Sequence, residues 1–73
     1  MNTTLLRQTW NLIETTNAWE LLEISEPELI QRLLKRLDAQ EPLEAKDRAC
    51  VNSYLHDKIN LIKDTAESRL VSV

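Results

Sequence analysis

The sequence predicts an all-α fold, a small bundle of three main helices and one short helix. Apolar residues recur at the three- and four-residue spacing of an amphipathic helix along most of the 73 residues. The chain contains no glycine, so it lacks the Asn-Gly and Asp-Gly turns that join neighbouring strands. Each interruption of the helical pattern carries a residue type that begins or stops a helix. A chain of this length is expected to form a single domain, residues 1–73, that buries only about 60% of its unfolded surface.

The first helix is expected over residues 3–16. Continuing it further would place Trp19 about half a turn away from Trp10 and expose one of the two indoles to water. We therefore expect a break at residues 15–17. The apolar side of this helix comprises Leu5, Leu6, Thr9, Trp10, Leu12, Ile13 and Thr16.

A short helix is expected next, over residues 18–23. Asn17 and Glu20 have the N-cap and N3 spacing in which the Asn side chain accepts a backbone N–H and the Glu side chain reaches back. Trp19 falls within the apolar arc of this helix, which predicts an anchor in the core or in an interface.

The third helix is expected over residues 26–39. Ser25 and Glu28 have the spacing of a capping box, and Pro27 lies in the first turn, where its missing N–H costs nothing. The apolar stripe of this helix comprises Leu29, Ile30, Leu33, Leu34 and Leu37.

Pro42 stops the helical pattern and predicts a connector over residues 38–43, followed by a long helix over 44–70. Its apolar arc spans about half of the helical wheel, wider than a surface helix needs. Such a face suits either several neighbours within the chain or a second subunit, and a homodimer is the commonest closed solution. The arc comprises Val51, Tyr54, Leu55, Ile59, Ile62, Ala66 and Leu70.

The ends of these helices are expected to be the weak points of the fold. A helix commonly ends in a glycine, which satisfies the last carbonyl groups, and this chain has none. Arg69 falls inside the apolar arc of the last helix, where its long stem can lie along apolar surface while its charge reaches water.

Few side chains of the sequence could carry catalysis. Without glycine the chain cannot build a phosphate-binding loop or a dinucleotide-binding turn. His56 and Cys50 are the only residues of their types, and six helical residues turn them about 120° apart, too far for a nucleophile and its base. We expect a solvent-facing histidine, a small apolar cysteine at the edge of the core and no enzyme activity.

No cofactor or metal ion is expected either. Structural zinc requires four Cys or His ligands, and this pattern is missing. Asp57, Asn60 and Asp64 form a row on the polar side of the last helix, a pattern typical of solvated surface. A single cysteine cannot close an intrachain disulfide, and no apolar run is long enough to span a membrane, so we expect a cytoplasmic protein.

A small helix-turn-helix-like DNA-binding regulator is the alternative function. Arg32, Lys35 and Arg36 form a basic cluster on the exposed side of the third helix. The net charge of −3 and the isoelectric point near 5.0 argue against it, because DNA-binding domains are usually basic. Cations in this part of the helix also complement the helix dipole.

The leading prediction is therefore a non-enzymatic protein–protein interaction module, a small adaptor or regulator that forms a homodimer. This prediction follows from the shortage of side chains that could act as nucleophile, base or metal ligand, and from the excess of apolar helix surface. The expected interface residues are Trp10, Trp19, Tyr54, Ile62 and Leu70.

Residues 5–14 (LLRQTWNLIE) and 61–69 (LIKDTAESR), with the helix start at Ile24 and Ser25, resemble small uncharacterised all-α proteins of cyanobacteria. The resemblance covers most of the chain through leucine-rich helical patterns. It implies a small all-α fold and a cyanobacterial cytoplasm, and it brings no catalytic or ligand-binding motif. Such chains begin the last helix with Ser or Asp, whereas this one has Glu44, a poor cap.

Overall fold

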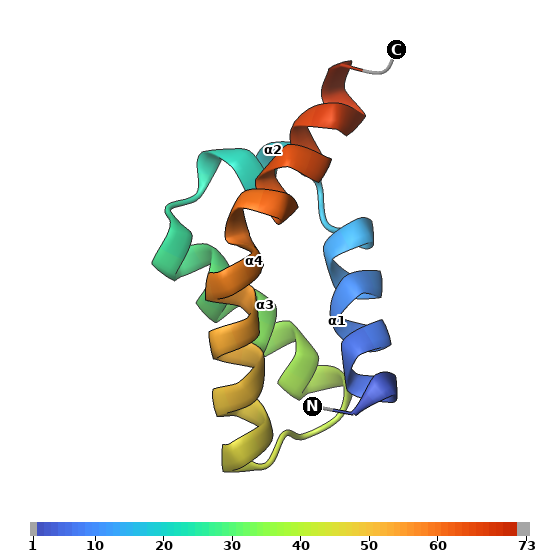
Figure 1. Ribbon diagram of the computed structural model, residues 1–73, viewed down its shortest axis with the longest axis vertical. Coiled ribbons are helices and arrows are strands. Elements are labelled where there is room, and N and C mark those ends of the chain that lie inside the picture. Colours follow the sequence, from blue (N-terminus) through green and yellow to red (C-terminus); the bar gives the residue numbers. More distant parts are fainter. Residues whose placement is uncertain (1, 72–73) are drawn as a thin grey trace.

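The computed structural model describes residues 2–71, and four helices account for nearly all of them (Figure 1). They are α1 (Thr3–Thr15), α2 (Ala18–Glu23), α3 (Glu26–Gln40) and α4 (Ala45–Val71). No strand occurs within this range. The all-α fold is confirmed, and each helix begins and ends within one residue of its expected position.

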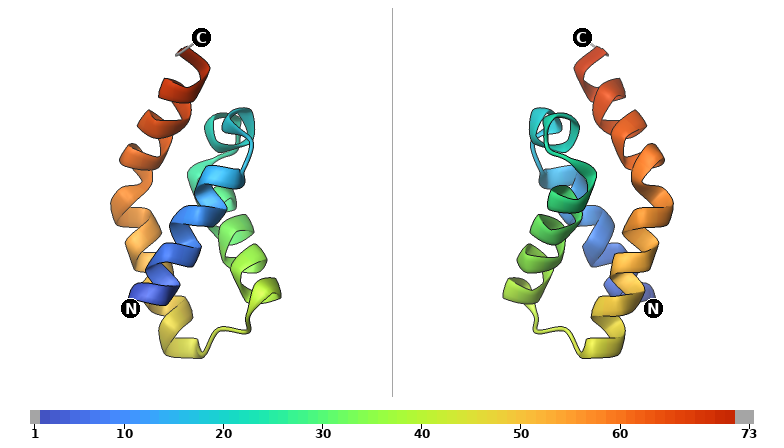
Figure 2. Two further views of the ribbon diagram at one scale, coloured as in Figure 1. Left: turned by 90° about the vertical axis from the view of Figure 1, so that its right-hand side faces the viewer. Right: turned by 90° about the vertical axis from the view of Figure 1, so that its left-hand side faces the viewer.

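The helices pack pairwise around one core. α1 packs against α3, α3 against α4, and α2 against α4. α4 runs along the long dimension of the molecule, and its last turns extend beyond α2 (Figures 1 and 2). The molecule measures 38 × 22 × 20 Å. A bilayer-crossing helix needs about 20 mostly apolar residues, and no helix within residues 2–71 meets that requirement.

The core is made of the apolar stripes that the sequence predicts. All five residues of the α3 stripe are buried, and so is most of the α4 arc, while Tyr54 and Leu70 at its margins are half-buried. The other three helices thus cover the wide face of α4 within one chain. The buried apolar residues are Leu5, Leu12, Ile13, Leu21, Leu29, Ile30, Leu33, Leu34, Leu37, Val51, Leu55, Ile59, Ile62 and Ala66.

Two helices begin with an asparagine cap. The Asn2 side chain accepts a hydrogen bond from the Leu5 N–H at 2.7 Å, which starts α1. The Asn17 side chain accepts one from the Trp19 N–H at 2.8 Å, which starts α2. The break between α1 and α2 is therefore confirmed, with Asn17 as the cap.

The capping boxes expected at α2 and α3 do not form. The Ser25 side chain makes no capping hydrogen bond. Glu28, its expected partner, accepts a hydrogen bond from Arg32 instead, at 3.1 Å. Glu20 likewise binds Arg32 and Arg36 rather than its own helix start. The prediction of capping boxes was wrong because arginine side chains within reach donate charge-assisted hydrogen bonds to these two carboxylates.

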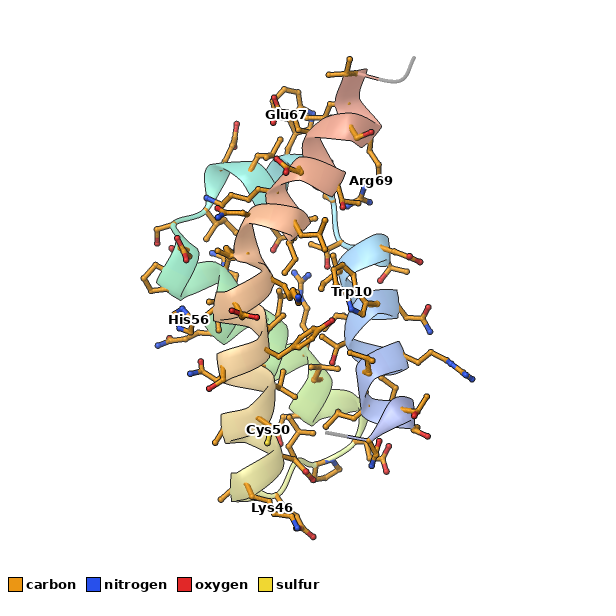
Figure 3. The ribbon with its side chains drawn as sticks, in the orientation of Figure 1. Trp10, Lys46, Cys50, His56, Glu67 and Arg69 are labelled. Atoms are coloured by element: carbon orange, nitrogen blue, oxygen red, sulfur yellow. The ribbon has the colours of Figure 1, made fainter. Side chains whose placement is uncertain are left out.

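A distant arginine holds the C-terminal end of α1. Arg69, from the last turns of α4, donates Nη1 to the carbonyls of Glu14 at 2.9 Å and Thr16 at 3.2 Å, and Nη2 to that of Ile13 at 3.4 Å. Figure 3 shows this side chain reaching from α4 toward α1. The guanidinium satisfies carbonyls that a glycine cap would otherwise serve, so this end is capped without glycine. Arg69 is exposed, as expected, but its guanidinium also binds the end of α1.

The connector between α3 and α4 is shorter than expected, covering residues 41–44. Asp38 belongs to the last turns of α3, and its carboxylate accepts the Leu43 N–H at 2.9 Å. The same carboxylate lies 3.1 Å from Arg48. The hydrogen bond from Leu43, assisted by the charge of Arg48, lowers the pKa of Asp38 below its ordinary value of 3.8.

Candidate interaction surface

Within residues 2–71, three large apolar side chains are exposed on the surface. Trp19 of α2 is 58% exposed, Leu61 of α4 is 51% exposed and Val71 of α4 is 76% exposed. The exposure of Trp19 excludes the core, one of the two places expected for it, and its role in an interface stays a prediction. Leu21, fully buried, fixes the inward side of α2, and Trp19 lies about 160° around the helix from Leu21.

Trp10 and Tyr54 form a pair that joins α1 to α4. The Trp10 indole N–H donates to the Tyr54 hydroxyl at 2.7 Å, and the two rings meet edge to face with centroids 6.3 Å apart. Figure 3 shows Trp10 projecting from α1 toward α4. Both side chains are half-buried, so this pair closes the α1–α4 side of the bundle while part of it faces water.

The five predicted interface residues therefore do not form one surface. Ile62 is wholly buried and contributes to the core of its own chain. Trp10 and Tyr54 contact each other, and Leu70 is half-buried near the end of α4. Trp19 alone among the five is freely exposed.

Exposed side chains also occur on α2 and in the C-terminal half of α4. On α2, Trp19 and Glu23 are separated by one turn and both are exposed. On α4, Asp64, Glu67 and Val71 are exposed and line an open depression. Every residue that lines this depression belongs to α4, whereas Trp19 and Glu23 lie on α2.

The predicted basic cluster is largely neutralised by acidic neighbours. Glu20 Oε1 lies 2.8 Å from Arg36 Nη2 and 3.3 Å from Arg32 Nη1, and Arg32 also pairs with Glu28. Lys35 is exposed on the same helix. The two arginines thus connect α3 to α2, and their charges are balanced within the chain.

The structure does not bring the other chemically interesting side chains together. His56 is exposed, as expected, but Cys50 is also exposed and does not lie at the edge of the core. Figure 3 shows Cys50 nearer the start of α4 than His56. Across residues 2–71, no three His, Cys, Asp or Glu side chains are placed so that they could hold a metal ion.

Two further open depressions occur on the described part of the chain. One, of about 430 Å³, lies between α3 and α4, and its lining contains one charged residue, Arg48, whose guanidinium pairs with Asp38. The other, of about 110 Å³, lies where α1 begins, beside the α3–α4 connector. Its carboxylates are Glu41, which accepts a hydrogen bond from Gln8 at 3.2 Å, and Asp47. Neither depression combines a nucleophile with a base.

Comparison of the chain with protein-family models, with curated proteins and with solved structures found no match. The resemblance to small cyanobacterial proteins consequently stays a prediction.

Proposed function

We propose that this protein is a non-enzymatic interaction module, a small adaptor or regulator that binds another protein through apolar side chains on its surface. The observation that carries the proposal is the exposure of Trp19. A tryptophan is costly to leave in water and is enriched among the residues that dominate binding energies at protein interfaces. The core of this chain is complete without Trp19, so folding alone gives no reason for an indole at this position.

Affinity capture from the natural host tests this proposal. The wild-type chain should retain at least one protein that a Trp19→Ala chain fails to retain, because the indole is the expected anchor. Trp10→Phe is the matched control, since it alters the other tryptophan and should leave retention intact. Identical retention by wild-type and Trp19→Ala chains would contradict the proposal.

We also propose that the module self-associates through the side of α4 that carries Leu61. Leu61 is 51% exposed, and half-buried Tyr54 lies two turns earlier on the same side of the helix. Light scattering at micromolar concentration should give a dimer mass for the wild type and a smaller mass for Leu61→Ser. A monomer mass at every concentration would exclude self-association.

No observation favours the DNA-binding alternative. Arg32 and Arg36 are paired with Glu20 and Glu28, and binding a phosphate would require breaking these pairs beside their carboxylates.

A further inference from the structure

One side of α4 carries a row of side chains that the chain does not bury. At about 100° per residue, Cys50 and Leu61 point within about 20° of each other, about three turns apart, and both are exposed. Half-buried Tyr54 and exposed Asp57 lie between them and point within about 40° of both. We name these four residues the α4 stripe.

The two polar residues of the α4 stripe are a hydrogen-bond donor and an acceptor that remain available. The Tyr54 hydroxyl accepts the Trp10 indole N–H at 2.7 Å, and among the described residues its own O–H finds no acceptor. The Asp57 carboxylate forms an ion pair within residues 2–71 only with its neighbour Lys58, at 4.0 Å. A second copy satisfies both groups if its α4 runs in the opposite direction, since Tyr54 of each copy then faces Asp57 of the other.

The same register matches the apolar residues of the α4 stripe. Tyr54 lies opposite Asp57 of the second copy when a two-fold axis passes between residues 55 and 56. Cys50 then lies opposite Leu61 of the second copy, because these two positions are also equally distant from the axis. The exposed leucine is thereby covered by a small, weakly polar side chain.

Opposite charges meet beside the α4 stripe in this register. Lys46 lies in the first turn of α4 (Figure 3), and Asp64 follows 18 residues later, about five turns, so the two point in the same direction, about 40° beyond Cys50. Both are exposed, and neither forms an ion pair with a described residue. Antiparallel pairing brings Lys46 of each copy beside Asp64 of the other.

A parallel pair would instead oppose like charges. Each residue would then face its own counterpart across the axis, so that Asp57 would meet Asp57 and Asp64 would meet Asp64. Charge complementarity therefore selects the antiparallel direction.

We propose that two copies of this chain pair through the α4 stripe with their α4 helices antiparallel, and that Lys46 of each copy binds Asp64 of the other. This proposal rests on the proposed self-association and specifies its geometry. The α4 stripe is buried between the copies, and the Tyr54 hydroxyl of each copy donates to Asp57 of the other.

Exchanging the two flanking charges tests the pairing. Lys46→Glu and Asp64→Lys should each raise the dimer dissociation constant about fivefold, because one substitution alters two contacts in a two-fold pair. The double variant Lys46→Glu/Asp64→Lys should return to within about twofold of the wild type. The two positions are about 27 Å apart on one helix, so this recovery cannot arise within a single chain. Analytical ultracentrifugation measures the three constants.

Lys46→Glu/Glu23→Lys is the matched control variant. It has the same net charge as the double exchange, but Glu23 is an exposed residue of α2 and lies outside the α4 stripe. It should dimerise as weakly as Lys46→Glu alone, and circular dichroism should show the wild-type helix content in every variant. Recovery in this control would show an effect of net charge alone and would overturn the proposal, as would a double exchange that does not recover.

Cys50 reports the direction of the helices independently. Antiparallel pairing separates the two Cys50 residues by about 16 Å along the helices, beyond the reach of a disulfide. At a concentration that gives a dimer mass, mild oxidation should therefore leave the chains unlinked. A disulfide-linked dimer would overturn the antiparallel geometry and leave the proposed self-association standing. A monomer mass at every concentration would overturn both.

Discussion

Arg69 shows how a single residue replaces a structural device that the chain lacks. Its guanidinium group donates to three carbonyls where α1 ends, 53 to 56 positions away in the sequence. A planar guanidinium suits this role, because it presents several donors in a fixed fork. At the residue scale the stability of the α1–α2 junction therefore depends on a side chain from the last turns of α4.

Replacing Arg69 should loosen that junction. Arg69→Ala is expected to lower the free energy of unfolding by about 1–2 kcal/mol, the range for hydrogen bonds from a charged donor at a partly solvated site. Arg69→Met keeps the apolar stem and should lose nearly as much, which separates the hydrogen bonds from packing. Urea unfolding measures both variants, and midpoints equal to that of the wild type would contradict the role assigned to Arg69.

Asp38 should make the free energy of unfolding depend on pH in the acid range. Its pKa is lower in the folded chain, chiefly through the Leu43 N–H, so its stabilising effect is present above its ordinary value of 3.8 and is lost as the pH falls through the lowered pKa. In Asp38→Asn this contribution should disappear, and stability should fall less steeply below that pH. Urea midpoints measured across the acid range test this, and parallel curves for the two proteins would contradict it.

At the scale of the elements, the helix starts differ in how they are capped. Asn17 accepts a hydrogen bond from the Trp19 N–H, whereas Ser25 makes no capping hydrogen bond. Asn17→Ala should therefore cost about 1 kcal/mol, and Ser25→Ala should cost much less. Thermal unfolding of the two variants side by side checks this, since the sequence alone predicts similar costs. A larger loss for Ser25→Ala would reverse the assignment.

The elements themselves are predictable because their signals are local. The spacing of Leu29 to Leu37, the break before Asn17 and the stop at Pro42 each depend on residues within a few turns of one another, and the structure confirms all three. The partners of Glu20 and Arg69 are not predictable in this way. These contacts join different helices, and a local pattern does not contain the packing that brings them together.

The exposure of Trp19 is likewise a property of the packing between elements. Six residues are too few to fix how a helix is rotated about its own axis, and in α2 the contact with α4 turns Leu21 inward and leaves Trp19 in water. The helical-wheel projection of α2 therefore could not show which of its two sides faces the core.

At the scale of the molecule, the interior of the described chain is complete while large apolar side chains remain on its surface. The buried polar side chains within residues 2–71 all find hydrogen-bond partners, among them Thr9 and Thr16, which donate to carbonyls four residues earlier. The exposed apolar side chains of Trp19, Leu61 and Val71 lie outside this interior. A module that folds alone and recognises a partner has this distribution, because binding then needs little rearrangement.

The two tryptophans allow the most direct test of binding through Trp19. In a two-dimensional ¹H–¹⁵N NMR titration with the host protein captured by the wild-type chain, the indole N–H signal of exposed Trp19 should move, together with the amides of α2. The indole N–H of Trp10 donates to the Tyr54 hydroxyl within the chain, so its signal should stay in place. Equal movement of both indole signals, or of neither, would contradict the central claim that this protein binds its partner through Trp19.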